Sequence, residues 1–183
     1  MRIIAGQHRG LTLATVGKGD AGAHLRPTSD RVRESLFSVL LGYGHPAGAR
    51  VLDLFAGTGA LGLEALSRGA VHATFVDDGR VAQKLIRENI TKTRRGDDST
   101  LIARDATRLP PNTGTPCDLV FLDPPYGKGL GLVALTAAHA GGWIAPDALI
   151  VWEESTPQPA PSGFTLQDQR RYGDTHITLL GAP

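Results

Sequence analysis

Short apolar segments alternate with helix-forming segments over most of the chain, and this alternation constrains the fold more than any other feature. Runs suited to buried strands are followed by stretches in which apolar residues recur at helical spacing. We expect strands over residues 50–55, 71–77, 100–104, 117–123 and 148–153, with helices over residues 60–68, 81–93 and 130–140. Strands that alternate with helices form a parallel sheet through right-handed crossovers, with helices on both faces. The sequence therefore predicts an α/β fold.

The two ends of the chain depart from this alternation. Residues 164–171 and 175–180 flank a glycine-containing turn and are typical of a hairpin that would complete a seven-stranded sheet, with the last strand antiparallel. At the other end, residues 2–5 and 11–15 are strand-like, and a helix is expected from Thr28, with Thr28 or Ser29 as its cap. We therefore expect two parts. Residues 1–27 would form an accessory hairpin and loop, and residues 28–183 would form the main domain.

Composition excludes several functions. No run of about 18 apolar residues occurs, and no apolar signal segment fits before the polar residues 7–9, so we expect a cytoplasmic protein without membrane contact. The single cysteine, Cys117, cannot form an internal disulfide, and the scattered histidines give no metal-ligand spacing, so no metal is expected. The length of 183 residues fits one domain with a short appendage, and we expect a monomer.

Basic residues are concentrated near the start of the chain. The net charge is only +1, but residues 1–33 carry six Lys or Arg against two acids. Such an excess on a mildly acidic body is typical of a segment that contacts phosphates. A solvated arm without a ligand would give the same distribution, so charge by itself leaves both interpretations open.

Acidic residues recur where the expected strands end. They are Asp53, Asp77 with Asp78, Asp105 and Asp123. Because ligands bind at the carboxyl ends of parallel strands, near the point where strand order reverses, these side chains are expected to meet at one edge of the sheet.

The glycine-rich residues 57–62 follow the first expected strand and open a helix. Their G-x-G-x-x-G spacing, with Asp77 twenty residues after the first glycine, is also the pattern of a dinucleotide site. Asp53 favours another cofactor, because a carboxylate beside the loop would repel a pyrophosphate and attract a sulfonium or amino group. These residues therefore predict that the cofactor is S-adenosylmethionine. Its ribose would bind Asp77 or Asp78, with Asp77 preferred because Asp78 can cap the following helix, and its adenine amino group would bind Asp105. Loop bracing or helix capping is the alternative role for Asp53.

The motif Asp123-Pro124-Pro125-Tyr126 follows the fourth expected strand. Two successive prolines make a rigid corner. The Asp123 carboxylate and the Pro124 carbonyl can then accept both N–H groups of an exocyclic amine on a base, which directs its lone pair at a sulfonium methyl and stabilises the developing charge. Tyr126 can stack on that base, which would have to be unstacked or flipped to enter. By itself, the motif could also be only a rigid turn.

Two sets of segments carry a family resemblance. Residues 51–65 and 123–126 resemble class I amino-methyltransferases, and residues 2–10 and 26–37 are similar to the ribosomal small-subunit methyltransferase D family. The resemblance implies a Rossmann-like class I methyltransferase fold and S-adenosylmethionine as cofactor. It implies methylation of the exocyclic N2 amine of one guanine in 16S ribosomal RNA, within a small-subunit particle or assembly intermediate. The chain departs from the family pattern at Asp78-Gly79 and in the glycine-rich residues 17–22, which bears on local contacts more than on the reaction.

The predicted site has three parts. The cofactor set is Asp53, Phe55, Ala56, Gly57, Thr58, Gly59, Asp77, Asp78, Asp105 and Ala106. The catalytic set is Asp123, Pro124, Pro125 and Tyr126. The RNA-binding set, implied by the resemblance and the basic N-terminal region, is Arg2, Arg9, Arg26, Thr28, Arg31 and Arg33. For Arg31 and Arg33, ion pairing with Asp30 or Glu34 is the alternative.

Three other functions remain open from the sequence. The aspartate-proline-proline-aromatic motif also occurs in adenine amino-methyltransferases, so adenine N6 of DNA or RNA is an alternative target. The glycine loop would also serve a nicotinamide-dependent oxidoreductase, although hydride transfer has no evident use for the Asp123 motif. A nucleic-acid-binding domain without catalysis is the third alternative, and the intact motif argues against it.

Overall fold

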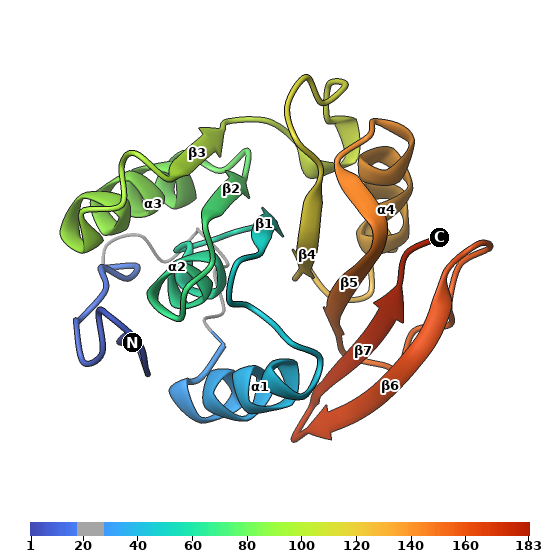
Figure 1. Ribbon diagram of the computed structural model, residues 1–183, viewed down its shortest axis with the longest axis horizontal. Coiled ribbons are helices and arrows are strands. Elements are labelled where there is room, and N and C mark those ends of the chain that lie inside the picture. Colours follow the sequence, from blue (N-terminus) through green and yellow to red (C-terminus); the bar gives the residue numbers. More distant parts are fainter. Residues whose placement is uncertain (18–27) are drawn as a thin grey trace.

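The computed structural model describes residues 1–17 and 28–183, and its centre is a seven-stranded sheet in the order β3-β2-β1-β4-β5-β7-β6 (Figure 1). The strands are β1 (Arg50–Leu54), β2 (His72–Val76), β3 (Ser99–Ile102), β4 (Cys117–Leu122), β5 (Ile144–Glu154), β6 (Thr165–Tyr172) and β7 (Thr175–Gly181). Strands β1 to β5 are parallel, whereas β7 is antiparallel to both β5 and β6. The predicted α/β sheet with its closing hairpin is confirmed. Strand order reverses between β1 and β4, which is where ligands bind in such sheets.

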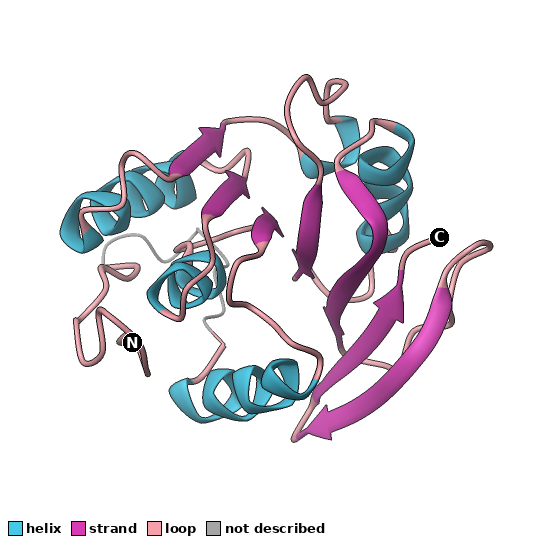
Figure 2. Cartoon of the chain, in the orientation of Figure 1, coloured by secondary structure: helices cyan, strands magenta, loops and turns pink. Residues whose placement is uncertain are grey.

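Helices cover both faces of the sheet (Figure 2). They are α1 (Asp30–Gly42), α2 (Ala60–Ser67), α3 (Arg80–Thr93) and α4 (Leu130–Ala140), with a short 3-10 turn, η1 (Ala106–Arg108). On one face, Val51, Phe75 and Phe121 share a core with α1, α2 and α3. On the other, Leu52 and Val120 pack with α4. Because successive strand side chains point to opposite faces, strands covered on both sides must be apolar throughout.

Most element boundaries differ from the predictions by one or two residues, and two of the differences have a clear physical cause. Helix α1 begins at Asp30 rather than at residue 28, because Ser29 is the N-cap and its hydroxyl accepts a hydrogen bond from the Val32 amide at 3.3 Å. Strand β5 begins at Ile144 rather than at residue 148. Cys117 pairs with Ile144, and the register then shifts before Leu119 pairs with Leu149. Because of this irregularity, the first residues of β5 do not continue the apolar run from which the strand was predicted.

Residues 1–17, here called the N-terminal segment, pack over α2 and reach α3. The predicted hairpin is present in minimal form, with one antiparallel bridge between Arg2 and Thr12 and a bond from the Ile3 amide to the Leu11 carbonyl at 2.9 Å. Ile3 and Leu13 are buried in the core of the main sheet. All eight residues of α2 are buried as a result.

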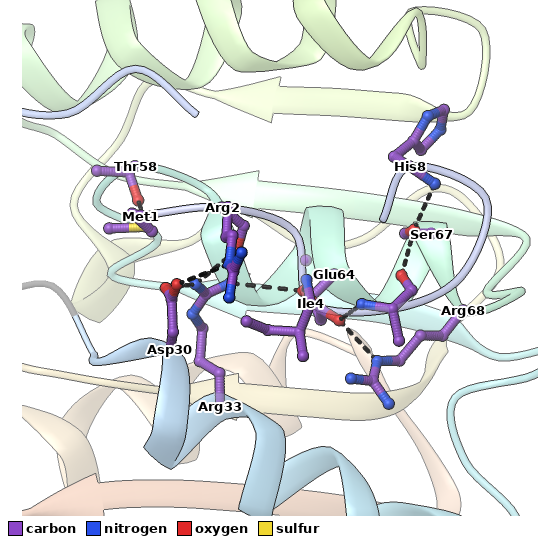
Figure 3. Close-up of polar contacts among 12 residues, drawn as sticks. Met1, Arg2, Ile4, His8, Asp30, Arg33, Thr58, Glu64, Ser67 and Arg68 are labelled. Carbon is purple, nitrogen blue, oxygen red and sulfur yellow. Dashed lines mark hydrogen bonds and ion pairs between the residues drawn. The ribbon is translucent and has the colours of Figure 1, made fainter. Parts of the chain in front are cut away.

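Glu64 of α2 fastens the N-terminal segment to the domain (Figure 3). Its fully buried carboxylate accepts the backbone amides of Ile4 at 2.8 Å and Ala5 at 3.0 Å. It also pairs with Arg68 at 2.7 Å and with Arg33 of α1 at 3.5 Å. A buried charge is tolerated only when it is paired and hydrogen-bonded, so this network links the segment to both helices.

No helix within the described ranges is both long enough and apolar enough to cross a membrane.

Candidate active site at the carboxyl ends of the parallel strands

Asp53 and Asp123 lie at the ends of adjacent strands. Strands β1 and β4 pair in register, with Leu54 opposite Leu122, and the Asp123 amide lies 3.4 Å from the Leu54 carbonyl. Strand alternation places Asp53 and Asp123 on the same face as Val51 and Phe121, the face covered by α1 and α2. The two carboxyl groups therefore meet at one point of the sheet, as the sequence predicted.

Asp53 is almost completely buried, at 1% exposure, and its Oδ2 accepts a hydrogen bond from the Gly62 amide of α2 at 2.9 Å. Burial raises the pKa of Asp53 to about 8; the Gly62 bond lowers this pKa, and the nearby charge of Asp77 raises it further. The loop-bracing role that the sequence left open is therefore present. A nearby cation would favour the ionised form of this carboxyl group.

The glycine loop turns sharply between β1 and α2. Phe55, Gly57 and Gly59 all have positive φ, at 59°, 59° and 76°, and Gly59 is the N-cap of α2 without a side-chain cap. Ala56 and Thr58 are buried, and the Thr58 hydroxyl lies 3.6 Å from the Met1 sulfur (Figure 3). Such a turn exposes backbone amides and lets a ligand approach the main chain closely.

Asp77 and Asp78 occupy different environments at the end of β2. The Asp77 carboxylate accepts the Gly57 amide at 2.9 Å and the Gly79 amide at 2.8 Å, so it holds the glycine loop against the start of α3. Burial raises the pKa of Asp77. Asp78 is exposed, and the N-cap of α3 is Gly79, without a side-chain bond. The expectation that Asp78 can cap α3 is wrong.

Asp105 follows β3 and caps η1. Its Oδ1 accepts both the amide and the hydroxyl of Thr107, at 2.8 Å and 2.7 Å. The hydroxyl and amide bonds from Thr107 lower the pKa of Asp105, so it is ionised at neutral pH. Its Oδ2 accepts no hydrogen bond from the described residues and remains available as an acceptor. Ala106 is buried beneath it in the core shared with α4.

Asp123 lies among other acids. Burial raises its pKa well above the usual value, and the charges of Glu153, Asp53 and Glu154 raise it further. The following Pro124 is buried and Pro125 is exposed, which is consistent with a rigid corner. A cluster of carboxyl groups that raise one another's pKa favours a positively charged ligand, because a cation relieves the repulsion between them.

Tyr126 is tied to β5 and β7 by its hydroxyl. It donates to Glu153 Oε1 at 2.6 Å and lies 3.2 Å from the Thr175 hydroxyl. Glu153 is 7% exposed, and its Oε2 accepts a hydrogen bond from the Thr28 hydroxyl at 3.3 Å. Glu153 thus joins the motif to the start of α1. Burial and the bond to Glu153 raise the pKa of Tyr126.

Sequence reasoning missed Glu153 and its neighbour Glu154 as site residues. Glu154 is 6% exposed and accepts the amides of Gly127 at 3.1 Å and Ser155 at 2.8 Å. Since neighbouring strand residues face opposite ways, the two glutamates hold the loop after β4 from both sides of the sheet. The signal was present: the two acids directly follow the apolar residues 148–152, at the same edge as the other four acidic positions.

Arg33 was predicted to contact RNA, which requires an exposed side chain, but it is buried. Its side chain is fully buried, and its guanidinium pairs with Asp30 and Glu64 and donates to the Arg2 carbonyl at 2.7 Å (Figure 3). The ion pairing left open as an alternative is present, although it is buried and includes Glu64. The prediction that Arg33 contacts RNA is therefore corrected. This residue instead holds α1, α2 and the N-terminal segment together.

The other predicted RNA contacts are arranged differently. Arg2, Arg9 and Arg31 are exposed, and Arg2 lies 3.5 Å from Asp30. Thr28 is partly buried and bound to Glu153, whereas Arg26 lies outside the described residues. The tip of the N-terminal segment lies at the far end of α2, so Arg9 is roughly 12 Å along that helix from the glycine loop.

Comparison with known sequences gives a match over nearly the whole chain. Residues 1–181 match the family model described as Conserved hypothetical protein 95. Ribosomal RNA small subunit methyltransferase D of Escherichia coli strain K12 is 40% identical over 183 residues, covering 98% of this chain and 88% of that protein. The protein of the same name from Haemophilus influenzae is 33% identical over 178 residues, covering 94% and 89%.

Solved structures give the same result. The methyltransferase yhhF of Escherichia coli superposes with a TM-score of 0.83 at 36% identity, covering 100% of this chain and 97% of that chain. TrmN of Thermus thermophilus has a TM-score of 0.68 at 24% identity over 89% of this chain and 52% of that chain, a likeness of fold alone.

Proposed function

The chain belongs to the family of Conserved hypothetical protein 95 and is an S-adenosylmethionine-dependent methyltransferase, and from this premise we propose that it methylates the exocyclic N2 amine of one guanine in 16S ribosomal RNA. The observation that carries the proposal is the meeting of Asp53 and Asp123 at the ends of β1 and β4. One carboxyl group serves the cofactor side of the cleft, and the other serves the amine.

The residues at the carboxyl edge fit S-adenosylmethionine. Burial raises the pKa of both Asp53 and Asp123, so the cleft has an excess of acid that a sulfonium and an amino group would balance. The second lone pairs of Asp77 are available to ribose hydroxyls, and Asp105 Oδ2 is available to an adenine amine. A pyrophosphate would place negative charge against the same carboxyl groups, which disfavours a nicotinamide cofactor.

The Asp123 motif supplies the acceptors for the reacting amine. S-adenosylmethionine supplies a methyl group bonded to a positively charged sulfur. The Asp123 carboxylate and the Pro124 carbonyl accept the two N–H groups of guanine N2, which turns the nitrogen lone pair toward that methyl group. The carboxylate also stabilises the positive charge that develops on the nitrogen and can take up its departing proton. The Tyr126 ring stacks on the flipped base, and Glu153 keeps that ring in place.

RNA would approach the surface formed by α1 and the N-terminal segment. Arg2, Arg9 and Arg31 are exposed there, and cations on one surface supply the sequence-independent part of RNA affinity. The substrate is proposed to be 16S RNA within a small-subunit particle or assembly intermediate. The enzyme is proposed to act in the cytoplasm as a monomer.

The decisive experiment incubates the protein with radiolabelled S-adenosylmethionine and small subunits that lack methylation, followed by mapping of the labelled nucleoside. Label in N2-methylguanosine of 16S RNA supports the proposal. Label in N6-methyladenosine would replace the guanine with the adenine alternative. Calorimetry that detects NAD binding but no S-adenosylhomocysteine binding would overturn the methyltransferase assignment.

A further inference from the structure

One face of α3 carries a row of cations. Arg80, Lys84, Arg87 and Arg94 are all exposed, and we call these four residues the basic stripe. At about 100° per residue, Arg80, Lys84 and Arg87 fall within an arc of roughly 60°, opposite the buried face of the helix, and Arg94 follows as the C-cap residue with a left-handed backbone. The stripe therefore places exposed positive charge along a helix of 14 residues that is roughly 21 Å long.

Local stability does not explain these cations. Within the described part of the chain, no member of the basic stripe lies within ion-pair distance of an acid; the one acid of α3, Glu88, pairs with Lys92 at 3.4 Å. The first turn of α3 contains no acid, its N-cap makes no side-chain bond, and Arg80 is its first residue. A cation at a helix N-terminus opposes the helix dipole, so Arg80 gains no stability from the dipole of α3.

The basic stripe connects the active site to the N-terminal segment. Its first residue, Arg80, follows Asp77 and Gly79 at the cofactor edge. At the other end, Arg95 lies 3.4 Å from Gln7, on the side of the molecule where Figure 1 shows the N-terminal segment beside α3. A hollow of about 430 Å³ opens there, lined by Gln7, His8, Leu11 and residues 92–95. The basic stripe thus runs from the cofactor edge toward the side of the molecule where the N-terminal segment lies.

We propose that the basic stripe of α3 binds the phosphate backbone of the RNA substrate, extending the RNA contact from the catalytic cleft to the hollow between α3 and the N-terminal segment. This inference rests on the proposed function. The basic stripe begins at the cleft and extends along α3. Such a row of cations suits a polyanion that places one nucleotide in the cleft while its phosphate backbone binds along the helix. RNA is the polyanion that the proposed function supplies, because the reacting amine there belongs to a guanine of 16S RNA.

The test compares two double variants that remove the same charge. Lys84→Gln/Arg87→Gln removes two cations of the basic stripe, and Arg170→Gln/Arg171→Gln removes two exposed cations of the edge strand β6. The dissociation constant of an unmodified 16S RNA transcript is measured between 50 and 200 mM salt. For two phosphate contacts, the slope of log affinity against log salt should become shallower by about 1.4 in the α3 variant. Across that range the wild type should then lose about sevenfold more affinity than the variant.

The edge-strand variant should keep the wild-type slope, and both variants should keep the wild-type melting temperature and affinity for S-adenosylhomocysteine. In methylation assays, the α3 variant should raise KM for RNA and leave kcat unchanged. An unchanged slope in the α3 variant, or an equal change in both variants, would overturn the proposal. If the wild type fails to methylate small subunits, the proposed function fails, whereas the binding slopes still decide whether the basic stripe contacts RNA.

Discussion

The hydroxyl of Tyr126 donates a 2.6 Å hydrogen bond to Glu153, and this bond fastens the catalytic motif after β4 to the end of β5. The same glutamate accepts a bond from Thr28 at the start of α1. The position of the Tyr126 ring is thereby set by residues from three separate parts of the chain.

Replacing Tyr126 with phenylalanine should separate stacking from positioning. The ring remains, but the bonds to Glu153 and Thr175 are lost, so we expect kcat to fall by about 10-fold, equivalent to roughly 1.4 kcal/mol, with little change in cofactor affinity. Tyr126→Ala removes the ring as well and should raise KM for RNA in addition. Steady-state kinetics on small subunits measure both effects. Equal losses in the two variants would show that the hydroxyl bond, and not stacking, is what matters.

Glu153→Gln should shift the pH dependence of the reaction. The Glu153 charge raises the pKa of Asp123, so its removal should lower that pKa, while a glutamine oxygen can still accept the Tyr126 hydroxyl. If the ionised form of Asp123 is the acceptor, the acidic limb of the kcat profile should move to lower pH. A limb that stays in place or moves to higher pH would contradict this assignment. Thr175→Val, which alters the other partner of Tyr126 without a charge, is the control.

Asp123→Ala should abolish methyl transfer and leave cofactor binding nearly intact. The variant loses the acceptor for the amine, and removal of one such electrostatic contact typically costs about 10²–10³ in kcat. Its affinity for S-adenosylhomocysteine should stay close to that of the wild type, because the glycine loop, Asp77 and Asp105 are untouched. Full activity in this variant would refute the proposed mechanism.

Asp53→Asn should stabilise the protein at alkaline pH while weakening cofactor binding. Burial raises the pKa of Asp53 from 3.8 to about 8, so the folded protein keeps a proton that the unfolded chain releases. This contribution to stability is complete below about pH 4 and is lost as the pH rises toward about 8. Asparagine can still accept the Gly62 amide and removes that loss, so we expect a gain of roughly 1–3 kcal/mol at pH 9 and little change at pH 4. Chemical denaturation at the two pH values measures the stability change, and calorimetric titration of S-adenosylhomocysteine measures the change in cofactor affinity. A stability gain that is the same at both pH values would contradict the raised pKa of Asp53.

Arg31 and Arg33, two residues apart on α1, should respond oppositely to the same substitution. Arg33→Gln breaks a buried network and leaves Glu64 with fewer partners, so we expect a loss of roughly 3–5 kcal/mol in unfolding free energy and faster proteolysis of the N-terminal segment. Arg31→Gln should leave stability within about 0.5 kcal/mol of the wild type, because its side chain is exposed, and should weaken RNA binding. Thermal melts and RNA titrations distinguish the two. Weaker RNA binding by a fully stable Arg33→Gln protein would contradict the structural role.

The sequence by itself determined the order of strands and helices, the glycine loop and the acids at the strand ends. Those features depend on local periodicity and on a topological rule: residues that end parallel strands meet at one edge. The meeting of Asp53 and Asp123 follows from that rule, whereas the closing hairpin follows from two strand-like runs around a glycine-containing turn.

Only the tertiary structure decided what each polar side chain contacts. Arg31 and Arg33 are the same residue type on the same helix, yet one faces solvent and the other is buried against Glu64, a residue 31 positions away. Glu153 could not be recognised as the partner of Tyr126 from the sequence, because that contact depends on the pairing of β4 with β5. Burial and long-range pairing are properties of packing between elements, and periodicity along one element carries no information about them.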